Sequence, residues 1–170
     1  MAEALDPILP DRVDALARQV LSEASIRGFT LAAAESCTGG LLASLLTDLP
    51  GLSNVFERGF VTYTDAAKTE MLGVPPALIA QHTAVSQEVA RAMAEGALER
   101  SHAEIAVSIT GWAEGGPDPK KPGGLVHFAS ARTSHGVRLR EAHFGDIGRA
   151  RLRVACLDVA LTMMLERMGG

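Results

Sequence analysis

The sequence has few cysteines and few aromatic residues. Its 170 residues include two cysteines, and aromatic residues make up only 4% of the chain. Cys37 and Cys156 lie far apart in the sequence, which excludes a disulfide framework and a zinc site of ordinary spacing. Because aromatic side chains are scarce, Ala, Leu, Val, Ile and Met must build the core.

Several classes of function also lack their sequence signals. No apolar run approaches the roughly 20 residues that span a bilayer, and the acidic N-terminus has no secretory pattern. The net charge is -4 and no basic block is present, so we expect no binding to nucleic acid or membrane, which both need clustered Lys and Arg. We find no metal-ligand spacing, P-loop or dinucleotide-binding turn, and therefore expect no metal and no cofactor. These absences favour a soluble cytoplasmic protein with reduced cysteines.

The apolar pattern predicts one domain, residues 1–170, in which helices alternate with strands. Spacings of three and four residues predict helices over 13–24, 41–49, 66–72, 86–98 and 152–163, with a helical turn from 75. Continuous or alternating apolar runs predict strands over 29–34, 59–63, 105–110, 125–131 and 137–144, the last two as an antiparallel hairpin. This order predicts an α/β fold, a three-layer α/β/α sandwich with a mixed central sheet.

The turn after residue 34 is the first candidate site, because ligands of such folds bind at the carboxyl ends of strands. Ser36 lies just before a predicted helix, whose first amides can hold a phosphate or a developing oxyanion. Gly39 and Gly40 would let a ligand approach the backbone closely. Alternatively, Ser36 or Thr38 is an ordinary helix cap. Cys37 is either a rival nucleophile or a small buried filler.

Tyr63 and Lys68 follow the second predicted strand and form another candidate. A serine hydroxyl is a weak nucleophile until a base removes its proton, and a lysine can be that base if burial lowers its pKa. The ordinary alternative for Lys68 is a solvated helix residue. The Tyr-x4-Lys spacing differs from the Tyr-x3-Lys of short-chain dehydrogenases.

Two later segments could bind an anion. The Gly- and Pro-rich loop over 111–124 could cradle a phosphate with its amides, helped by Lys120 or Lys121, or could be a simple surface loop. Arg149 begins a run of arginines at the start of the last helix, which could clamp a phosphate or pair with carboxylates.

Taken in order, these segments resemble the CinA C-terminal domain family, the nicotinamide-nucleotide amidohydrolases. The resemblance extends over residues 11–166. The matching motifs are Ala34–Gly40 (AESCTGG), Gly59–Tyr63 with Lys68, Leu72–Val74, Ala84–Ser86, Ser108–Gly111, Phe144–Asp146 and Gly148–Arg149.

The resemblance implies an α/β/α fold and hydrolysis of the carboxamide of nicotinamide mononucleotide to nicotinate mononucleotide and ammonia. By position, it implies that Ser36 is the nucleophile, that Lys68 is the general base and that Tyr63 assists Lys68. It also implies a small-molecule nucleotide as partner and a homo-oligomer. The implied substrate-binding residues are Thr38, Gly39, Gly40, Thr110, Gly111 and, at the phosphate, Arg149.

The chain departs from the family pattern in two places. Asp65 stands where the family usually has Asn, and its charge would tend to raise the pKa of Lys68. The 111–124 loop carries Trp112, Glu114, Asp118 and Gly123 at positions that break the family's Gly-rich pattern. These departures leave two alternatives, a nucleotide-binding module without catalysis and a Ser/Lys amidase that acts on another small amide.

Overall fold

The computed structural model describes residues 9–116 and 118–169. Its centre is a five-stranded sheet in the order β2-β1-β3-β4-β5. The strands are β1 (Leu31–Glu35), β2 (Phe56–Val61), β3 (Ile105–Gly111), β4 (Leu125–Arg132) and β5 (Val137–His143). β1 pairs in parallel with β2 and β3, whereas β3–β4 and β4–β5 are antiparallel. The mixed sheet and its late hairpin are therefore confirmed.

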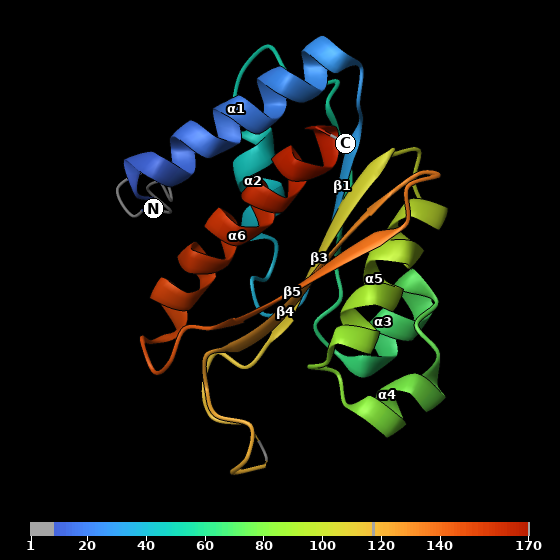
Figure 1. Ribbon diagram of the computed structural model, residues 1–170, viewed down its shortest axis with the longest axis vertical. Coiled ribbons are helices and arrows are strands. Elements are labelled where there is room, and N and C mark those ends of the chain that lie inside the picture. The colour runs from blue at the N-terminus through green and yellow to red at the C-terminus, as the bar shows by residue number, and fades with distance from the viewer. Residues whose placement is uncertain (1–8, 117, 170) are drawn as a thin grey trace.

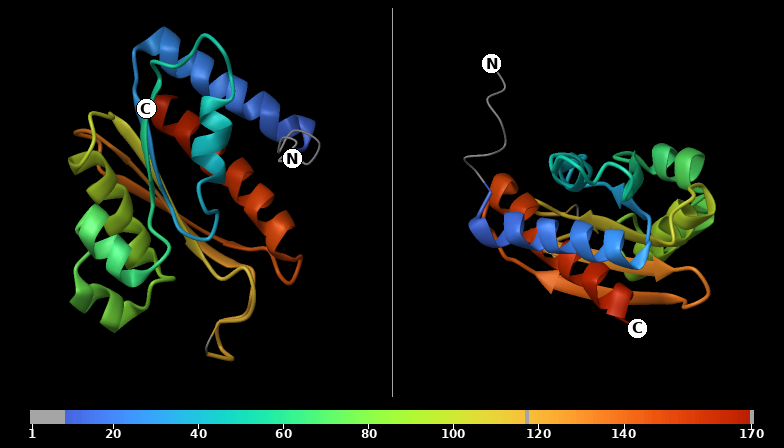
Figure 2. Two further views of the ribbon diagram at one scale, coloured as in Figure 1. Left: turned by 180° about the vertical axis from the view of Figure 1, so that it is seen from behind. Right: turned by 90° about the horizontal axis from the view of Figure 1, so that it is seen from above.

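Helices cover both faces of the sheet. α1, α2 and α6 lie on one face and α3, α4 and α5 on the other (Figures 1 and 2). The helices are α1 (Asp11–Arg27), α2 (Leu41–Thr47), α3 (Asp65–Leu72), α4 (Pro76–His82), α5 (Gln87–Glu99) and α6 (Arg149–Gly169). The predicted three-layer sandwich is confirmed. Within the described residues, no helix combines the length and the apolar character that crossing a membrane requires.

The central strand β1 contributes to both layers of the core. Leu31 and Ala33 pack toward α1 and α6, whereas Ala32 and Ala34 pack toward α5. A strand covered by helices on both faces has no polar side, which explains its continuous apolar run. Small alanines at its centre fit a core made of aliphatic side chains rather than aromatic rings.

The position of β2 differs from the prediction. The strand predicted over 59–63 runs instead from Phe56 to Val61. β2 is an edge strand that pairs only with β1, and most of its side chains are at least partly exposed. Glu57 and Arg58 at its start therefore need no apolar character, and the apolar pattern could not reveal them.

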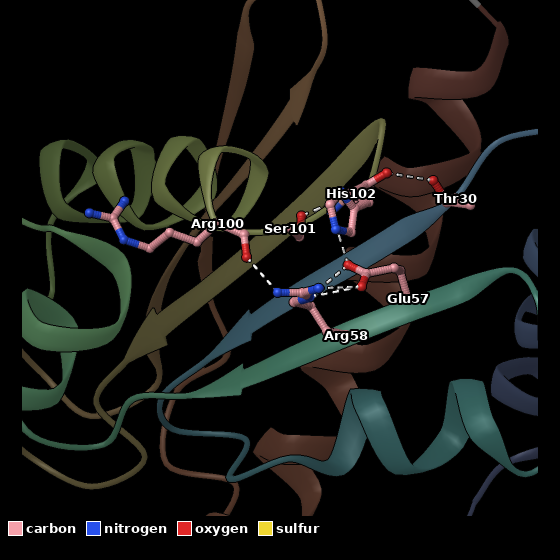
Figure 3. A network of polar contacts seen from close by, with 7 residues as sticks. Thr30, Glu57, Arg58, Arg100, Ser101 and His102 are labelled. Atoms are coloured by element: carbon pink, nitrogen blue, oxygen red, sulfur yellow. Dashed lines mark hydrogen bonds and ion pairs between the residues drawn. The ribbon is translucent and has the colours of Figure 1, made fainter.

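A polar network joins the amino ends of the strands (Figure 3). The Arg58 guanidinium donates to the Glu57 carboxylate at 2.6–2.8 Å and to the Arg100 carbonyl at 2.8 Å. The His102 amide donates to the same carboxylate at 3.0 Å, and the Thr30 hydroxyl donates to the His102 carbonyl at 3.1 Å. This amino-end network (Thr30, Glu57, Arg58, Arg100 and His102) ties the edge strand β2 to the turn between α5 and β3.

Candidate active site

The topology creates a crevice at the opposite, carboxyl end of the sheet. The chain leaves β1 toward α2 on one face and leaves the neighbouring β2 toward α3 on the other. Ligands bind where adjacent parallel strands send their connections to opposite faces. Ser36 directly follows β1 and Tyr63 follows β2, while Lys68 lies on α3. The fold therefore brings the three predicted catalytic residues to one place.

Lys68 contacts Ser36 in the interior of this crevice. Its side chain is buried, with 1% of the residue exposed. Lys68 Nζ lies 3.1 Å from Ser36 Oγ, 2.9 Å from the Thr62 carbonyl oxygen and 3.4 Å from the Tyr63 carbonyl oxygen. Lys68 is thus no solvated helix residue, and its amine faces the serine predicted to be the nucleophile.

The surroundings of Lys68 favour its neutral form. Burial lowers the pKa of Lys68, and the nearby Asp65 and Cys37 oppose that shift only in part. The expected effect of Asp65 is therefore present but smaller than the effect of burial. A neutral amine has two N–H donors and one lone pair. If the Thr62 and Tyr63 carbonyls accept those hydrogens, the lone pair remains for the Ser36 hydroxyl.

Glu35 caps the helix that follows Ser36, a role that the sequence analysis missed. Its carboxylate is fully buried and accepts hydrogen bonds from the amides of Leu42 at 3.1 Å and Ala43 at 2.8 Å. Neither Ser36 nor Thr38 caps α2 with its side chain. The sequence signal for this capping role was a glutamate in an apolar strand just before a helix, because a buried carboxylate needs hydrogen-bond donors. The start of α2 is consequently occupied by the protein itself.

The two glycines of the turn have a conformational role. Gly39 and Gly40 have φ angles of 62° and 95°, in the left-handed region that favours glycine. The Gly39 amide donates to the Ser36 carbonyl at 3.1 Å. Thr38 is buried, and its hydroxyl has no hydrogen-bond partner among the described residues. None of these three residues lines the cavity described below, so their contact with a substrate stays a prediction.

Cys37 packs as part of the core. It is 4% exposed, belongs to the apolar cluster on the α1 and α6 face, and its carbonyl accepts a hydrogen bond from Arg153 Nε at 3.0 Å. Its thiol interacts with that of Cys156, and this interaction together with burial raises the pKa of Cys156. This packing supports the interpretation of Cys37 as a filler rather than a rival nucleophile.

A cavity of about 340 Å³ opens above Ser36 and Lys68. Of the predicted substrate-binding residues, Thr110, Gly111 and Arg149 line it. The Thr110 hydroxyl donates a hydrogen bond to the Ala84 carbonyl at 2.8 Å, and this bond joins two of the residues that line the cavity. The other lining residues are Cys37, Asp65, Ala84, Val85, Trp112, Ala113, Glu114 and Gly115. Residues 112–115 belong to the loop predicted as a possible phosphate cradle, whereas Ala84 and Val85 were not predicted as site residues.

Tyr63 also borders the cavity, but its contact with Lys68 is made by the backbone. The residue is 62% exposed, and the hydrogen bond that joins it to Lys68 Nζ goes to its carbonyl oxygen. Assistance of Lys68 by the phenol hydroxyl stays a prediction.

Arg149 reaches the cavity already paired. Its guanidinium lies 3.3 Å from the Glu114 carboxylate, and the two side chains are 43% and 71% exposed. This contact joins the start of α6 to the loop between β3 and β4, which projects beyond the sheet in Figure 1. In the part of the chain that the structure describes, no group of three or more His, Cys, Asp and Glu side chains could hold a metal ion.

Comparison with known proteins gives consistent matches. The CinA C-terminal domain family matches residues 13–168. The nicotinamide-nucleotide amidohydrolase PncC of Escherichia coli K12 is 48% identical over 135 residues, which are 77% of this chain and 81% of that protein. The crystal structure of the competence/damage inducible protein CihA from Agrobacterium tumefaciens has a TM-score of 0.91 and 44% identity, and the match covers 95% of this chain and 98% of that chain.

Longer proteins match as well. A putative competence-damage inducible protein of Symbiobacterium thermophilum is 58% identical over 108 residues, which are 62% of this chain and 25% of that protein. A CinA-like protein of Chlorobaculum tepidum is 49% identical over 148 residues, 84% of this chain and 34% of that protein. The matched segment of this chain thus spans between a quarter and a third of these longer relatives.

Proposed function

The chain belongs to the CinA C-terminal domain family, and we propose that it hydrolyses the carboxamide of nicotinamide mononucleotide to nicotinate mononucleotide and ammonia. The observation that carries this proposal is the buried 3.1 Å contact between Lys68 Nζ and Ser36 Oγ at the base of a cavity. The name of the similar Escherichia coli protein, a nicotinamide-nucleotide amidohydrolase, supports the substrate.

The reaction would proceed through a covalent ester on Ser36. Neutral Lys68 takes the hydroxyl proton as Ser36 Oγ attacks the carboxamide carbon. The tetrahedral intermediate then collapses with cleavage of the C–N bond, and the Lys68 ammonium gives the proton to the departing NH₂ group, which leaves as ammonia. Water attacks the ester with Lys68 again as base, and release of the acid restores the Ser36 hydroxyl.

The intermediate carries an oxyanion that needs a hydrogen-bond donor. The amides of Leu42 and Ala43 already donate to Glu35, so they are not the donors. We assign this role to the backbone N–H of Cys37, because Cys37 borders the cavity directly after Ser36. In many hydrolases the residue after the nucleophile supplies such a donor.

The remaining cavity residues would hold the nucleotide. Thr110 and Gly111 flank the carboxamide end, and Arg149 meets the phosphate. Tyr63 assists Lys68 at least through its carbonyl oxygen, which accepts a hydrogen bond from Lys68 Nζ. The exposed Tyr63 ring borders the cavity, where the ring can stack on the cationic pyridine ring of the substrate. Thr38, Gly39 and Gly40 would contribute to substrate binding only indirectly, because they shape the turn that carries Ser36.

Ammonia release from nicotinamide mononucleotide tests the proposal directly. We expect turnover by the wild type and a loss of at least about 10³-fold in kcat for Ser36→Ala, since removal of a nucleophile leaves only binding and electrostatic contributions. Ser44→Ala is the matched control, because Ser44 is an exposed serine on α2 and should retain activity within about twofold.

The outcomes separate the alternatives. Multiple turnover excludes the module without catalysis. Saturable binding of the nucleotide without ammonia release would overturn the proposal in favour of that module. Faster hydrolysis of unrelated small amides than of nicotinamide mononucleotide would overturn the substrate while retaining the Ser/Lys mechanism.

A further inference from the structure

We propose that Glu114 is a specificity-determining residue, which occupies Arg149 and thereby makes the site accept phosphate-free nicotinamide riboside about as well as the nucleotide. The inference rests on the proposed function, because it assumes that a nicotinamide carboxamide reaches Ser36. It goes further by naming the class of substrate that the cavity favours, an N-ribosylated pyridinium amide with or without a phosphate.

Glu114 and Arg149 both line the cavity, and their charged groups lie 3.3 Å apart. A phosphate that binds the Arg149 guanidinium must displace the Glu114 carboxylate or accept its repulsion. A nucleoside has no group that competes for Arg149, and therefore leaves the ion pair intact.

The charge of the cavity also disfavours a phosphate. Its charged lining residues are Asp65, Glu114, Lys68 and Arg149, and burial lowers the pKa of Lys68. Two carboxylates and one guanidinium line the cavity beside Lys68, whose charged form burial disfavours, and this balance favours the cationic pyridine ring over the phosphate dianion.

Two other basic side chains, Lys121 and Arg153, make hydrogen bonds outside the cavity lining. Lys121 Nζ donates to the Thr83 hydroxyl at 2.8 Å, and Arg153 Nε donates to the Cys37 carbonyl at 3.0 Å. Neither residue lines the cavity. Arg149 is consequently the guanidinium in the lining on which a phosphate would depend, and Glu114 controls its availability.

The test measures kcat/KM for ammonia release from nicotinamide mononucleotide and from nicotinamide riboside. We expect wild-type values within about tenfold of each other. Glu114→Gln should raise kcat/KM for the nucleotide about fivefold through a lower KM with kcat unchanged, an effect of the size expected for a partly exposed ion pair. The value for the riboside should change by less than about twofold.

A charge-matched control separates this effect from a change in net charge. Glu23→Gln removes the carboxylate of another exposed ion pair, 3.0 Å from Arg27 on α1, and should leave both substrates unaffected. In an Arg149→Ala background, Glu114→Gln should have a smaller effect on the nucleotide, because only the direct repulsion between Glu114 and the phosphate remains and the difference measures the coupling between the two residues.

Binding to the Ser36→Ala protein gives a second readout that does not need turnover. Glu114→Gln should lower the Kd of nicotinamide mononucleotide by a similar factor. The specificity ratio is kcat/KM for the nucleotide divided by kcat/KM for the riboside. If Glu114→Gln and Glu23→Gln hydrolyse the nucleotide with the same ratio, the role of Glu114 is overturned but the proposed function is not. Absence of turnover on both substrates would instead overturn the proposed function.

Discussion

The two ends of the central sheet carry polar clusters of opposite character. At the carboxyl end, Glu35, Ser36 and Lys68 are buried, and the hydrogen bonds of Lys68 go to neutral oxygens. At the amino end, the network around Glu57 and Arg58 lies partly in solvent and pairs opposite charges (Figure 3). Both clusters join the same strands, so the difference between them is one of environment rather than of topology.

The comparison shows how exposure decides what a charged side chain does. Arg58 holds the pKa of the Glu57 carboxyl below its ordinary value, so the amino-end pair stays charged at neutral pH. Such exposed pairs contribute little to stability, because water screens them. Burial instead lowers the pKa of Lys68, which is the direction that its proposed role as a base requires. The amino end thus carries a charged pair in partial contact with water, whereas the carboxyl end carries a buried amine and the proposed nucleophile.

Among the variants that test this difference between the two ends of the sheet, Lys68→Met should have the largest effect. It removes the base but keeps an apolar chain of similar length, and we expect kcat to fall by about 10²–10⁴-fold. In the wild type, activity should rise with pH through the lowered pKa of Lys68, since only the neutral amine accepts a proton. A pH profile of kcat/KM checks this, and the low-pH limb should be absent from any residual activity of the variant.

Stability provides the control for the same variant. The lowered pKa of Lys68 means that the folded state binds the proton less readily than the unfolded chain, where the pKa is near 10.5. Folding is therefore penalised below that pH, and the penalty disappears as the pH rises past it. Lys68→Met should be at least as stable as the wild type at pH 7, by chemical denaturation. A marked loss of stability with an unchanged pH profile would contradict the assignment of Lys68.

The sequence predicted the layers better than the contacts within them. The periodicity of α5 and α6 and the apolar run of β1 reflect burial, which is local and periodic, so these elements were predicted correctly. The start of β2 was not, because an edge strand carries charged side chains at no cost. Ser36 and Lys68 could be proposed from chemistry and resemblance, but their contact depends on a parallel pairing of β1 and β2 that no local pattern reveals.

Contacts between distant segments explain what the sequence analysis missed. Glu35 was passed over because its donors, on α2, become visible only when the helix start is placed above the strand end. The pairing of Arg149 with Glu114 joins segments that are far apart in the chain. Spacing along the sequence cannot predict such pairs. The sequence did mark Gly39 and Gly40, but for the close approach of a ligand rather than for the left-handed φ angles that they adopt.

Glu35→Gln should have the next largest effect. One amide oxygen would replace two carboxylate acceptors, and an NH₂ group would face a backbone N–H of α2. We expect a loss of about 1–3 kcal/mol in the free energy of unfolding, the usual cost of a buried unsatisfied group. Urea denaturation measures it. Glu57→Gln is the matched control, because Glu57 also accepts a backbone N–H but lies at the exposed end. Equal losses in the two variants would break the comparison.

Arg58→Gln should have the smallest effect of the series. The guanidinium lies against the Glu57 carboxylate and donates to the Arg100 carbonyl, but 41% of its side chain is exposed. Water can replace both interactions, so we expect a loss below about 1 kcal/mol in the free energy of unfolding. The loss should shrink further in 1 M salt, where the screening length falls to about 3 Å. Denaturation at low and high salt checks this. A loss of several kcal/mol that salt does not alter would mean that the amino-end network is as constrained as the buried end, and that exposure is not what separates the two.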